Sequence, residues 1–518
     1  IMKKLTLLLF FVSFLTNGQN ITVASGKSFT IEKTGAVTMS GNFSNAGTFI
    51  LNSDSDEFSS LIIGGSVTGN ITYNRYVNSV GTNEWDLIGA PVSGQSINSF
   101  VTANTSTLAT NGATKAIGYY NNTDNTWTNY TTSTIVGAGN FPLGKGFQMA
   151  TNANGTGILS FTGAPTATNQ TWTIIDNDAA NSGAGTRWNL VANPFPSYIY
   201  GNANADSSHN FLTVNSDKLN DSYEAIYGYD ADGSGYTVYN NTSAALRLAP
   251  GQAFMVASDN AENDTISFTT AMRTTTGGDD LIVGRDPIDS FELVLKLYEG
   301  DSEIDHTKFY FGDGLSLNLD PGYDAGHFNQ GASLMSRLVE EDEGVGLVIN
   351  AMGIESANDV VVPIELNREA GNNFRISIGT FNIDTAINVY LEDNVQETMT
   401  LLNDQDFELT AENELSGVGR FFIHLTETVL SIDDKIETNY LNVFKADVNN
   451  FITVEGLANQ SNGTKLRLYT IRGKEVTFTT LNNTNNKQTI STQGLSTGIY
   501  IVKLESGNIL LTKKLFIK

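Results

Sequence analysis

Carboxylates are the side chains whose spacing in this sequence is best suited to chemistry. The segment 230–235 reads Asp-Ala-Asp-Gly-Ser-Gly, with oxygen-bearing side chains at its first, third and fifth positions and Gly at the sixth. This is the pattern of the first half of a calcium-binding loop. The twelfth position is Asn241 where such a loop has Glu, so the loop is incomplete. We predict Asp230 and Asp232 as calcium ligands.

A second acidic group is our first choice for the same ion. Asp313, Asp320 and Asp324 flank Gly and Pro turns in an acidic part of the chain. Carboxylates on tight turns supply the hard oxygen ligands that calcium prefers. Calcium is therefore the one cofactor that the sequence suggests.

The sequence patterns that could indicate a catalytic site are weaker than those for calcium binding. Glu299, Asp301, Glu303 and Asp305 alternate, so in a strand they would share one face, and sandwich glycosidases need only two acids. They also fall between two strand-like segments, where a solvated hairpin would place them. The chain has four histidines: His209, His306, His327 and His424. None of them has the spacing of a metal site or a catalytic triad, and no Gly-x-Ser-x-Gly motif occurs. We name no catalytic residue and expect no enzyme.

The chain contains four tryptophans. Trp85 and Trp188 sit in apolar segments and are predicted to be core residues. Trp127 and Tyr236 occupy matching positions near turns, with other tyrosines around them. Two interpretations remain open for this pair: a hairpin packing cluster, or an exposed surface on which sugar rings stack.

The net negative charge of the chain argues against nucleic acid and anionic lipid as partners. The whole chain carries a formal charge of −26. Residues 430–518 contain 11 Lys or Arg against 7 Asp or Glu, a net of +4, so −26 minus +4 leaves −30 for the rest. A body this acidic repels nucleic acid and anionic lipid and attracts divalent cations.

Composition indicates an all-β, multidomain protein. The 518 residues exceed what one core organises, and 49 Gly with only 16% charged residues suit short strands joined by tight turns. We expect tandem β-sandwich-like modules. The chain has no Cys, which excludes disulfides and thiolate metal sites.

The first residues predict an export signal. Met2-Lys3-Lys4 precedes the apolar run 5–15, which is too short to span a membrane, and small residues at Thr16 and Gly18 predict cleavage after residue 18. We therefore assign 1–18 as a signal peptide and expect no transmembrane segment in the mature chain.

Four further regions follow along the chain. Residues 19–72 alternate short strands and turns, which predicts a small β-solenoid or an open sheet. The motif Trp85 to Pro91 recurs as Trp188 to Pro194, and Gly144-Lys145-Gly146-Phe147 recurs as Gly251-Gln252-Ala253-Phe254. Ordered recurrence predicts two related β-rich units, 73–175 and 176–276. A linker at 277–287 and a β-sandwich at 288–429, with antiparallel strands, complete the body.

The C-terminal segment 437–518 again alternates strands and turns, which predicts a small sandwich with a basic surface. Its blocks 466–476 (LRLYTIRGKEV), 495–503 (LSTGIYIVK) and 513–518 (KKLFIK) resemble the type A sorting domain of the type IX secretion system. Residues 443–447 lack the Asn-Pro pair that this family often has near its start. The sorting motif residues are Gly473, Leu495, Gly498, Tyr500, Lys513, Lys514 and Lys518.

The resemblance implies an Ig-like β-sandwich domain that directs the protein through the periplasm and across the outer membrane by the type IX secretion machinery. It also implies either release or attachment to surface lipopolysaccharide. Our leading prediction is a non-enzymatic, adhesin-like protein that is secreted or lies on the outer cell surface and contacts glycans. The alternative is a secreted protein that binds or cleaves polysaccharide.

Overall fold

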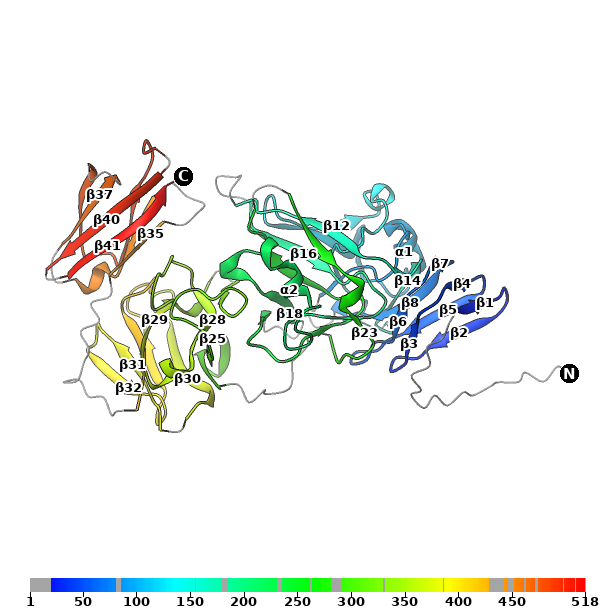
Figure 1. Ribbon diagram of the computed structural model, residues 1–518, viewed down its shortest axis with the longest axis horizontal. Helices are drawn as coiled ribbons and strands as arrows, with labels where there is room; N and C mark the ends of the chain where they lie inside the picture. Colours follow the sequence, from blue (N-terminus) through cyan, green and yellow to red (C-terminus); the bar gives the residue numbers. More distant parts are fainter. Residues whose placement is uncertain are drawn as a thin grey trace.

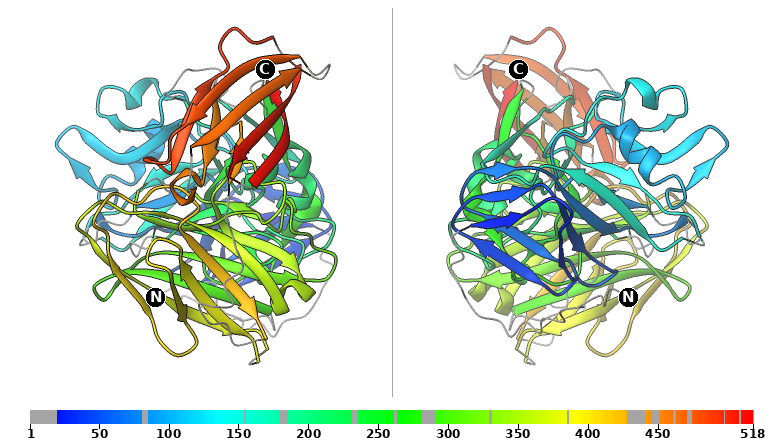
Figure 2. Two further views of the ribbon diagram at one scale, coloured as in Figure 1. Left: turned by 90° about the vertical axis from the view of Figure 1, so that its left-hand side faces the viewer. Right: turned by 90° about the vertical axis from the view of Figure 1, so that its right-hand side faces the viewer.

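The computed structural model shows an elongated arrangement of β-modules that follow one another in sequence order (Figure 1). Seen from the two ends, the C-terminal domain rests against the third module (Figure 2). The structure describes residues 20–80, 85–153, 155–178, 185–230, 235–260, 263–280, 291–328, 331–384, 386–427, 441–445, 451–460, 463–470, 474–496, 498–507 and 509–517. The predicted signal peptide lies outside the described residues.

The first module is a three-sided solenoid. Each side is a stack of parallel strands, as in the pairing of Ile21 with Phe43 and of Ser28 with Thr48. Alternation points Phe43, Phe49 and Leu51 into a dry interior. The strands are β1 (Ile21–Val23), β2 (Ser28–Ile31), β3 (Ala36–Met39), β4 (Phe43–Asn45), β5 (Thr48–Asn52), β6 (Ser60–Ile63), β7 (Val67–Thr68) and β8 (Ile71–Tyr76).

The solenoid and the first repeat unit share one core. β8 pairs antiparallel with β14, and a single hydrophobic cluster runs from Val23 to Phe161. The elements of this unit are β9 (Asp86–Ile88), α1 (Ile97–Ala103), β10 (Thr110–Asn111), β11 (Thr114–Asn121), β12 (Thr126–Thr131), η2 (Ile135–Gly137), β13 (Phe147–Met149) and β14 (Ile158–Gly163).

The second unit has the same topology as the first. Its sheet runs β19-β18-β21-β16, and the corresponding sheet of unit 1 runs β12-β11-β13-β9. The elements are β15 (Gln170–Ile174), β16 (Trp188–Ala192), β17 (Tyr198–Tyr200), α2 (Phe211–Asn215), η3 (Ser216–Lys218), η4 (Asp221–Tyr223), β18 (Ile226–Asp230), β19 (Gly235–Tyr239), β20 (Arg247–Leu248), β21 (Ala253–Ala257), β22 (Asp264–Phe268), η5 (Thr270–Met272) and β23 (Arg273–Thr274).

The boundary between the units differs from the sequence prediction. We placed it at 175/176, but β15, which ends at Ile174, pairs with β22 and so belongs to unit 2. The partner of β15 lies about 90 residues further along the chain, and such a pairing leaves no local signal. Unit 2 therefore begins by Gln170.

A buried asparagine repeats the same contacts in both units. The Asn104 amide donates to the Phe100 and Ser160 carbonyl oxygens, and its own oxygen accepts from the Ser160 amide. Asn215 makes the same three bonds, with Phe211 and Ser267. Each asparagine thus ties the end of its helix to an equivalent strand, β14 in unit 1 and β22 in unit 2, because burial requires its polar atoms to be paired.

The two units face each other across a pseudo-twofold axis. Gly89 donates its amide to the Gly251 carbonyl oxygen at 2.7 Å, and its counterpart Ala192 donates to the Gly144 carbonyl oxygen at 2.9 Å. Gly144 and Gly251 both have positive φ, which favours glycine in this turn. Such reciprocal contacts are those of an isologous interface, formed here within one chain.

Gly89 lies against its own counterpart at this axis. A Cβ atom added to Gly89 would lie 2.3 Å from the Cβ of Ala192, which is too close for any real pair of carbon atoms. We expect Gly89→Ala to destabilise the body by about 1–3 kcal/mol through overpacking, measured by urea unfolding of the mature chain. Adding Ala192→Gly should recover most of this loss. A single variant as stable as wild type would contradict the close contact.

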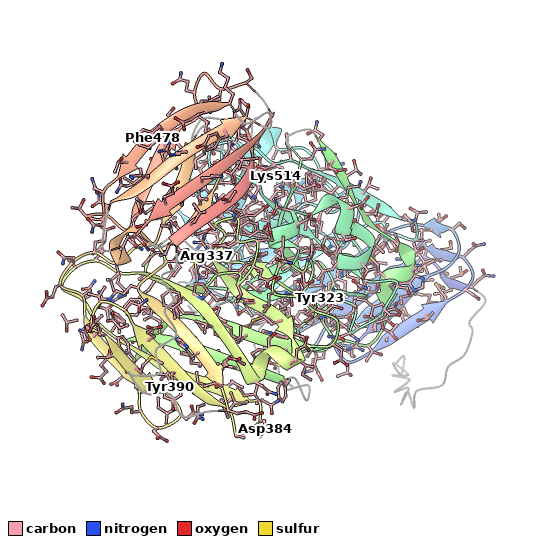
Figure 3. All side chains as sticks on the ribbon, turned by 60° about the vertical axis from the view of Figure 1, so that its left-hand side comes forward. Tyr323, Arg337, Asp384, Tyr390, Phe478 and Lys514 are labelled. Atoms are coloured by element: carbon pink, nitrogen blue, oxygen red, sulfur yellow. The ribbon has the colours of Figure 1, made fainter. Side chains whose placement is uncertain are left out.

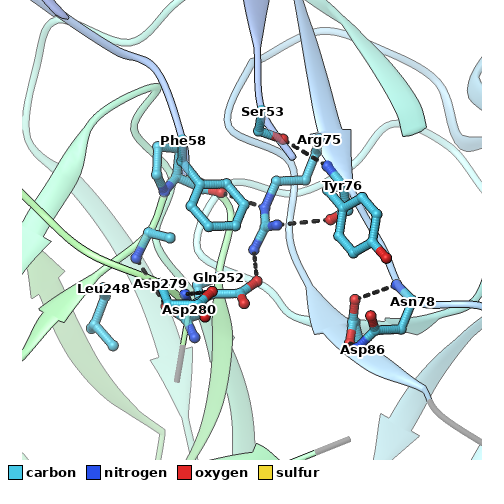
Figure 4. Close-up of polar contacts among 12 residues, drawn as sticks. Ser53, Phe58, Arg75, Tyr76, Asn78, Asp86, Leu248, Gln252, Asp279 and Asp280 are labelled. Atoms are coloured by element: carbon cyan, nitrogen blue, oxygen red, sulfur yellow. Dashed lines mark hydrogen bonds and ion pairs between the residues drawn. The ribbon is translucent and has the colours of Figure 1, made fainter. Parts of the chain in front are cut away.

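The first part of the predicted linker is packed against the body (Figure 4). The fully buried Arg75 donates to the Pro250 and Tyr76 carbonyl oxygens and pairs with the Asp280 carboxylate at 2.5 Å. The Tyr198 hydroxyl donates to the Gly278 carbonyl oxygen at 2.9 Å. Residues 277–280 are therefore anchored to the solenoid and unit 2, and the rest of the 277–287 prediction lies outside the described residues.

The third module is built on one curled sheet in the order β32-β31-β34-β29-β27-β28-β25-β24-β30-β33. Phe407 of β33 approaches Phe421 of β34, with 5.9 Å between ring centroids, so the sheet folds over a single core. The elements are β24 (Phe291–Glu299), β25 (Ser302–Gly312), β26 (Ala325–Gly326), β27 (Ser333–Ser336), β28 (Leu347–Gly353), η6 (Ile354–Asn358), β29 (Asp359–Asn367), β30 (Asn373–Asn382), β31 (Asn388–Asp393), β32 (Thr398–Leu401), β33 (Phe407–Thr410) and β34 (Phe421–Thr426).

We expected antiparallel strands throughout this module, but the sheet is mixed. β25 and β28 run parallel, with Lys308 opposite Ile349. The segment between these two strands is long enough for the crossover that a parallel pair needs.

The C-terminal domain consists of two packed sheets, β35-β36-β39 and β38-β37-β40-β41, around one core. Its elements are β35 (Asn442–Phe444), β36 (Phe451–Glu455), η8 (Leu457–Asn459), β37 (Thr464–Thr470), β38 (Glu475–Leu481), β39 (Lys487–Ser491), β40 (Gly498–Ser506) and β41 (Ile509–Ile517). Across all described residues, no helix is both long and apolar enough to cross a membrane.

Candidate functional site

Hairpin β11–β12 of unit 1 carries the predicted binding residue Trp127. Trp127 lies directly opposite Tyr120, and their rings are 5.2 Å apart. The Tyr120 hydroxyl is bonded to the Asn125 and Thr186 side chains, which fixes this ring in place. Trp127 is 37% exposed, and the adjoining β11–β12 turn, residues 122–125, is made of polar residues.

The matching aromatic pair in unit 2 is packed against another module. Tyr229 and Tyr236 again lie opposite each other, with rings 5.3 Å apart. Phe328 of the third module covers Tyr236 at 4.0 Å and also contacts Trp188 at 4.4 Å. Burial raises the pKa of Tyr236 well above its ordinary value. Tyr236 is thus an interface residue, and Trp127 is the exposed member of the repeat pair.

Phe328 was missed by sequence reasoning. It belongs to the segment between β25 and β28, where nothing in the local pattern marks an aromatic anchor. The neighbouring His327 pairs with Asp305 at 2.9 Å, and Asp305 also accepts from the Leu334 amide. These contacts hold the segment that presses Phe328 onto unit 2.

The two predicted core tryptophans are half-buried. Trp188 packs between Tyr223, Tyr227 and Phe328. Trp85 packs against Ala109, Ala116 and Ala150. Each tryptophan therefore lies at the edge of a hydrophobic cluster.

The acidic residues predicted to bind calcium have other contacts. Asp324 is fully buried, and its two oxygens accept the amides of Asp320 and Ala351 at 2.6 and 2.7 Å. Burial raises its pKa to about 7. Asp320 in turn accepts from the Ser316 amide at 2.7 Å, and Asp313 is exposed.

The described residues contain no group of three or more His, Asp or Glu side chains placed to hold a metal ion. Asp230 ends β18, and Asp232 lies outside the described residues. Calcium binding stays a prediction for both acidic groups.

Three of the four alternating carboxylates contact a basic side chain. Glu299 pairs with Arg368 at 2.9 Å, and Asp305 pairs with His327. Glu303 contacts His306 and Lys296, which lower its pKa to about 2. A carboxylate that stays ionised and paired is a poor general acid. This arrangement favours a structural role for the hairpin of β24 and β25.

Of the sorting residues, Leu495 and Tyr500 pack on the core of the C-terminal domain, and Lys513 and Lys514 lie on its last strand, β41. Tyr500 is buried and donates to the Ser496 carbonyl oxygen, while the half-buried Leu495 packs on the core. Lys514 is exposed on β41, and its neighbour Lys513 donates to the Asp342 carbonyl oxygen of the third module. Gly498 begins β40, and Gly473 and Lys518 lie outside the described residues.

Arg337 joins the third module to the C-terminal domain (Figure 3). Its buried guanidinium contacts Asp342 at 3.0 Å, Glu365 at 2.8 Å and Glu455 at 3.2 Å. Glu455 belongs to β36 of the C-terminal domain, is fully buried, and also pairs with Lys487 at 2.7 Å. The two domains therefore share one buried ion cluster.

Comparison with known proteins identifies two families. The family described as Domain of unknown function (DUF8693) matches residues 11–424, and the family described as Secretion system C-terminal sorting domain matches residues 446–518. The second match confirms the predicted sorting domain. In the structure this domain begins by β35, because β35 pairs with β36.

Other comparisons add little. No curated protein matches the chain. A solved structure titled "Biofilm associated protein - BSP domain" is 8% identical and aligns over 87% of this chain and 96% of its own, with a TM-score of 0.17, which supports no inference. The chain belongs to the family described as Domain of unknown function (DUF8693), and it is a type IX secretion cargo protein that is exported to the cell surface or secreted.

Proposed function

We propose that this exported protein is a non-enzymatic, adhesin-like protein that binds glycans through hairpin β11–β12 of unit 1. One observation carries the proposal: of two equivalent aromatic positions, Tyr236 is covered by Phe328, whereas Trp127 is 37% exposed. A large aromatic ring held open to solvent costs stability, and a sugar ring that stacks on it removes that cost.

The surroundings of Trp127 suit a sugar. Tyr120 backs the indole ring, and the turn offers the Asn125 side chain together with the Asp124 carboxylate, which accepts from Thr126 at 2.6 Å. Sugars need both an apolar platform and nearby hydrogen-bonding groups. Attachment to surface lipopolysaccharide, or release into the medium, stays a prediction of the sorting domain family.

Trp127→Ala tests this proposal in the mature chain. In gels that contain a polysaccharide which retards the wild type, we expect the variant to be retarded less. The apparent affinity should fall about tenfold or more, because the stacking platform is lost. Thr128→Ala, an exposed neighbour on the opposite side of the hairpin, is the matched control and should bind like wild type.

Two results would count against the proposal. Equal retardation of the Trp127 variant and the control would remove this surface from binding. Release of reducing sugar ends by the wild-type protein would instead favour the polysaccharide-active alternative.

A further inference from the structure

Lys145 occupies an unusual position at the junction of the two repeat units. It lies in the turn before β13, and its ammonium nitrogen faces three aromatic rings. The distances to the ring centroids are 5.2 Å for Tyr119, 5.5 Å for Phe147 and 5.9 Å for Trp172. Tyr119 and Phe147 come from unit 1 and Trp172 from unit 2, so the cluster exists only because the units are packed together.

The Lys145 ammonium has no anionic partner. Among the described residues, no carboxylate lies within 4.0 Å of this nitrogen, although the body carries a net charge of −30. Arg187, another partly buried cation of the body, is paired with Asp178 at 3.1 Å. Burial lowers the pKa of Lys145, and no neighbouring carboxylate opposes the shift. A partly buried cation whose only charge-stabilising neighbours are aromatic rings can still accept an anionic ligand, because the rings do not neutralise its charge.

Folding of the turn does not require a charge at this position. The equivalent residue of unit 2 is Gln252, whose side-chain oxygen accepts the Ala249 amide at 2.9 Å. Both turns keep the glycine with positive φ that precedes this residue. Lysine is therefore a difference between the units that the backbone geometry does not explain.

Two of the three rings around Lys145, Tyr119 and Trp172, are partly exposed, whereas Phe147 is buried. Tyr119, Tyr130 and Trp172 are all half-buried, and the two tyrosine rings lie 5.5 Å apart. Since side chains of a strand alternate, Tyr119 is on the opposite face of hairpin β11–β12 from Tyr120 and Trp127. The cluster is thus separate from the surface assigned to glycan binding above.

We propose that Lys145, with Tyr119 and Trp172, binds a ring-shaped ligand that carries one negative charge, such as a single carboxylated sugar residue. The ammonium receives the carboxylate and the aromatic faces receive the ring. A single charge is favoured because the acidic body repels polyanions. This site does not depend on Trp127, so either can fail without the other.

The test is titration of the mature chain with methyl glucuronide, followed by tryptophan fluorescence at constant ionic strength. The uncharged methyl ester of the same sugar and a long polyuronate are the comparison ligands. Lys145→Gln places in unit 1 the residue that unit 2 already has, so the variant is expected to fold normally. Lys115→Gln, at a half-buried position elsewhere on β11, is the matched control.

We expect saturable binding of methyl glucuronide, about tenfold weaker in Lys145→Gln and unchanged in Lys115→Gln. Binding should persist in Trp127→Ala, which separates this site from the proposed glycan surface. Three outcomes would overturn the proposal: no binding by the wild type, equal binding of the methyl ester, or equal binding by Lys145→Gln. Stronger binding of the polyuronate would overturn the preference for a single charge.

Discussion

A chain lacking residues 437–518 is expected to accumulate in the periplasm as a folded body. The sorting domain has its own core, so its removal leaves the hydrophobic clusters of the body in place. Its family match at 446–518 assigns it the export role. The measurement is fractionation of cells into periplasm, outer surface and medium, compared with the full-length protein.

Total amounts in whole cells must be measured alongside, because the deletion also removes Glu455, one of the three carboxylates that contact Arg337. A truncated body that is degraded would be missing from every fraction, which differs from retention. Detection of intact truncated protein at the surface or in the medium would rule out the sorting role.

Replacing Arg337 is expected to produce the largest loss of stability from a single substitution. Arg337→Met leaves the fully buried Glu455 and the neighbouring Asp342 without this cation, and breaking one side of a buried ion pair costs about 3–5 kcal/mol. Because Glu455 lies in the C-terminal domain and Arg337 in the third module, the loss should also weaken the contact between them. Urea unfolding and limited proteolysis of the full chain measure both effects.

Arg467→Met is the matched control for Arg337. Arg467 also pairs with a glutamate, Glu475 at 3.1 Å, but on the surface of the C-terminal domain, where water screens the pair. Its replacement should change stability little. If the two variants unfold alike, the Arg337 cluster does not hold the domains together. Adding Glu455→Gln to Arg337→Met should recover part of the loss, since it removes a buried carboxylate that has lost one of its two cations and keeps only Lys487.

Local patterns in the sequence were sufficient for the repeat and for the tail. The repeated turn could be recognised because it needs a glycine with positive φ, at Gly144 and again at Gly251, followed closely by a core phenylalanine. The tail could be recognised because its strands and terminal lysines follow a family pattern over about 80 consecutive residues. In both cases the information lies within one stretch of chain.

Pairings between distant residues could not be predicted in the same way. The contact of Arg337 with Glu455 spans 118 residues, and that of Arg75 with Asp280 spans 205. Neither residue of these pairs is marked by its neighbours. The same limit explains why β15 was assigned to the wrong unit and why the start of the linker was not expected to be packed.

Strand periodicity, turn chemistry and family motifs are properties of consecutive residues, so the sequence alone predicted an all-β protein with repeated units and a sorting domain for export. Which of two equivalent aromatic positions faces solvent became visible only in the fold. Trp127 and Tyr236 have the same place in the same hairpin, but Phe328 reaches only the second. Exposure depends on what packs against a residue, and here that neighbour comes from another module.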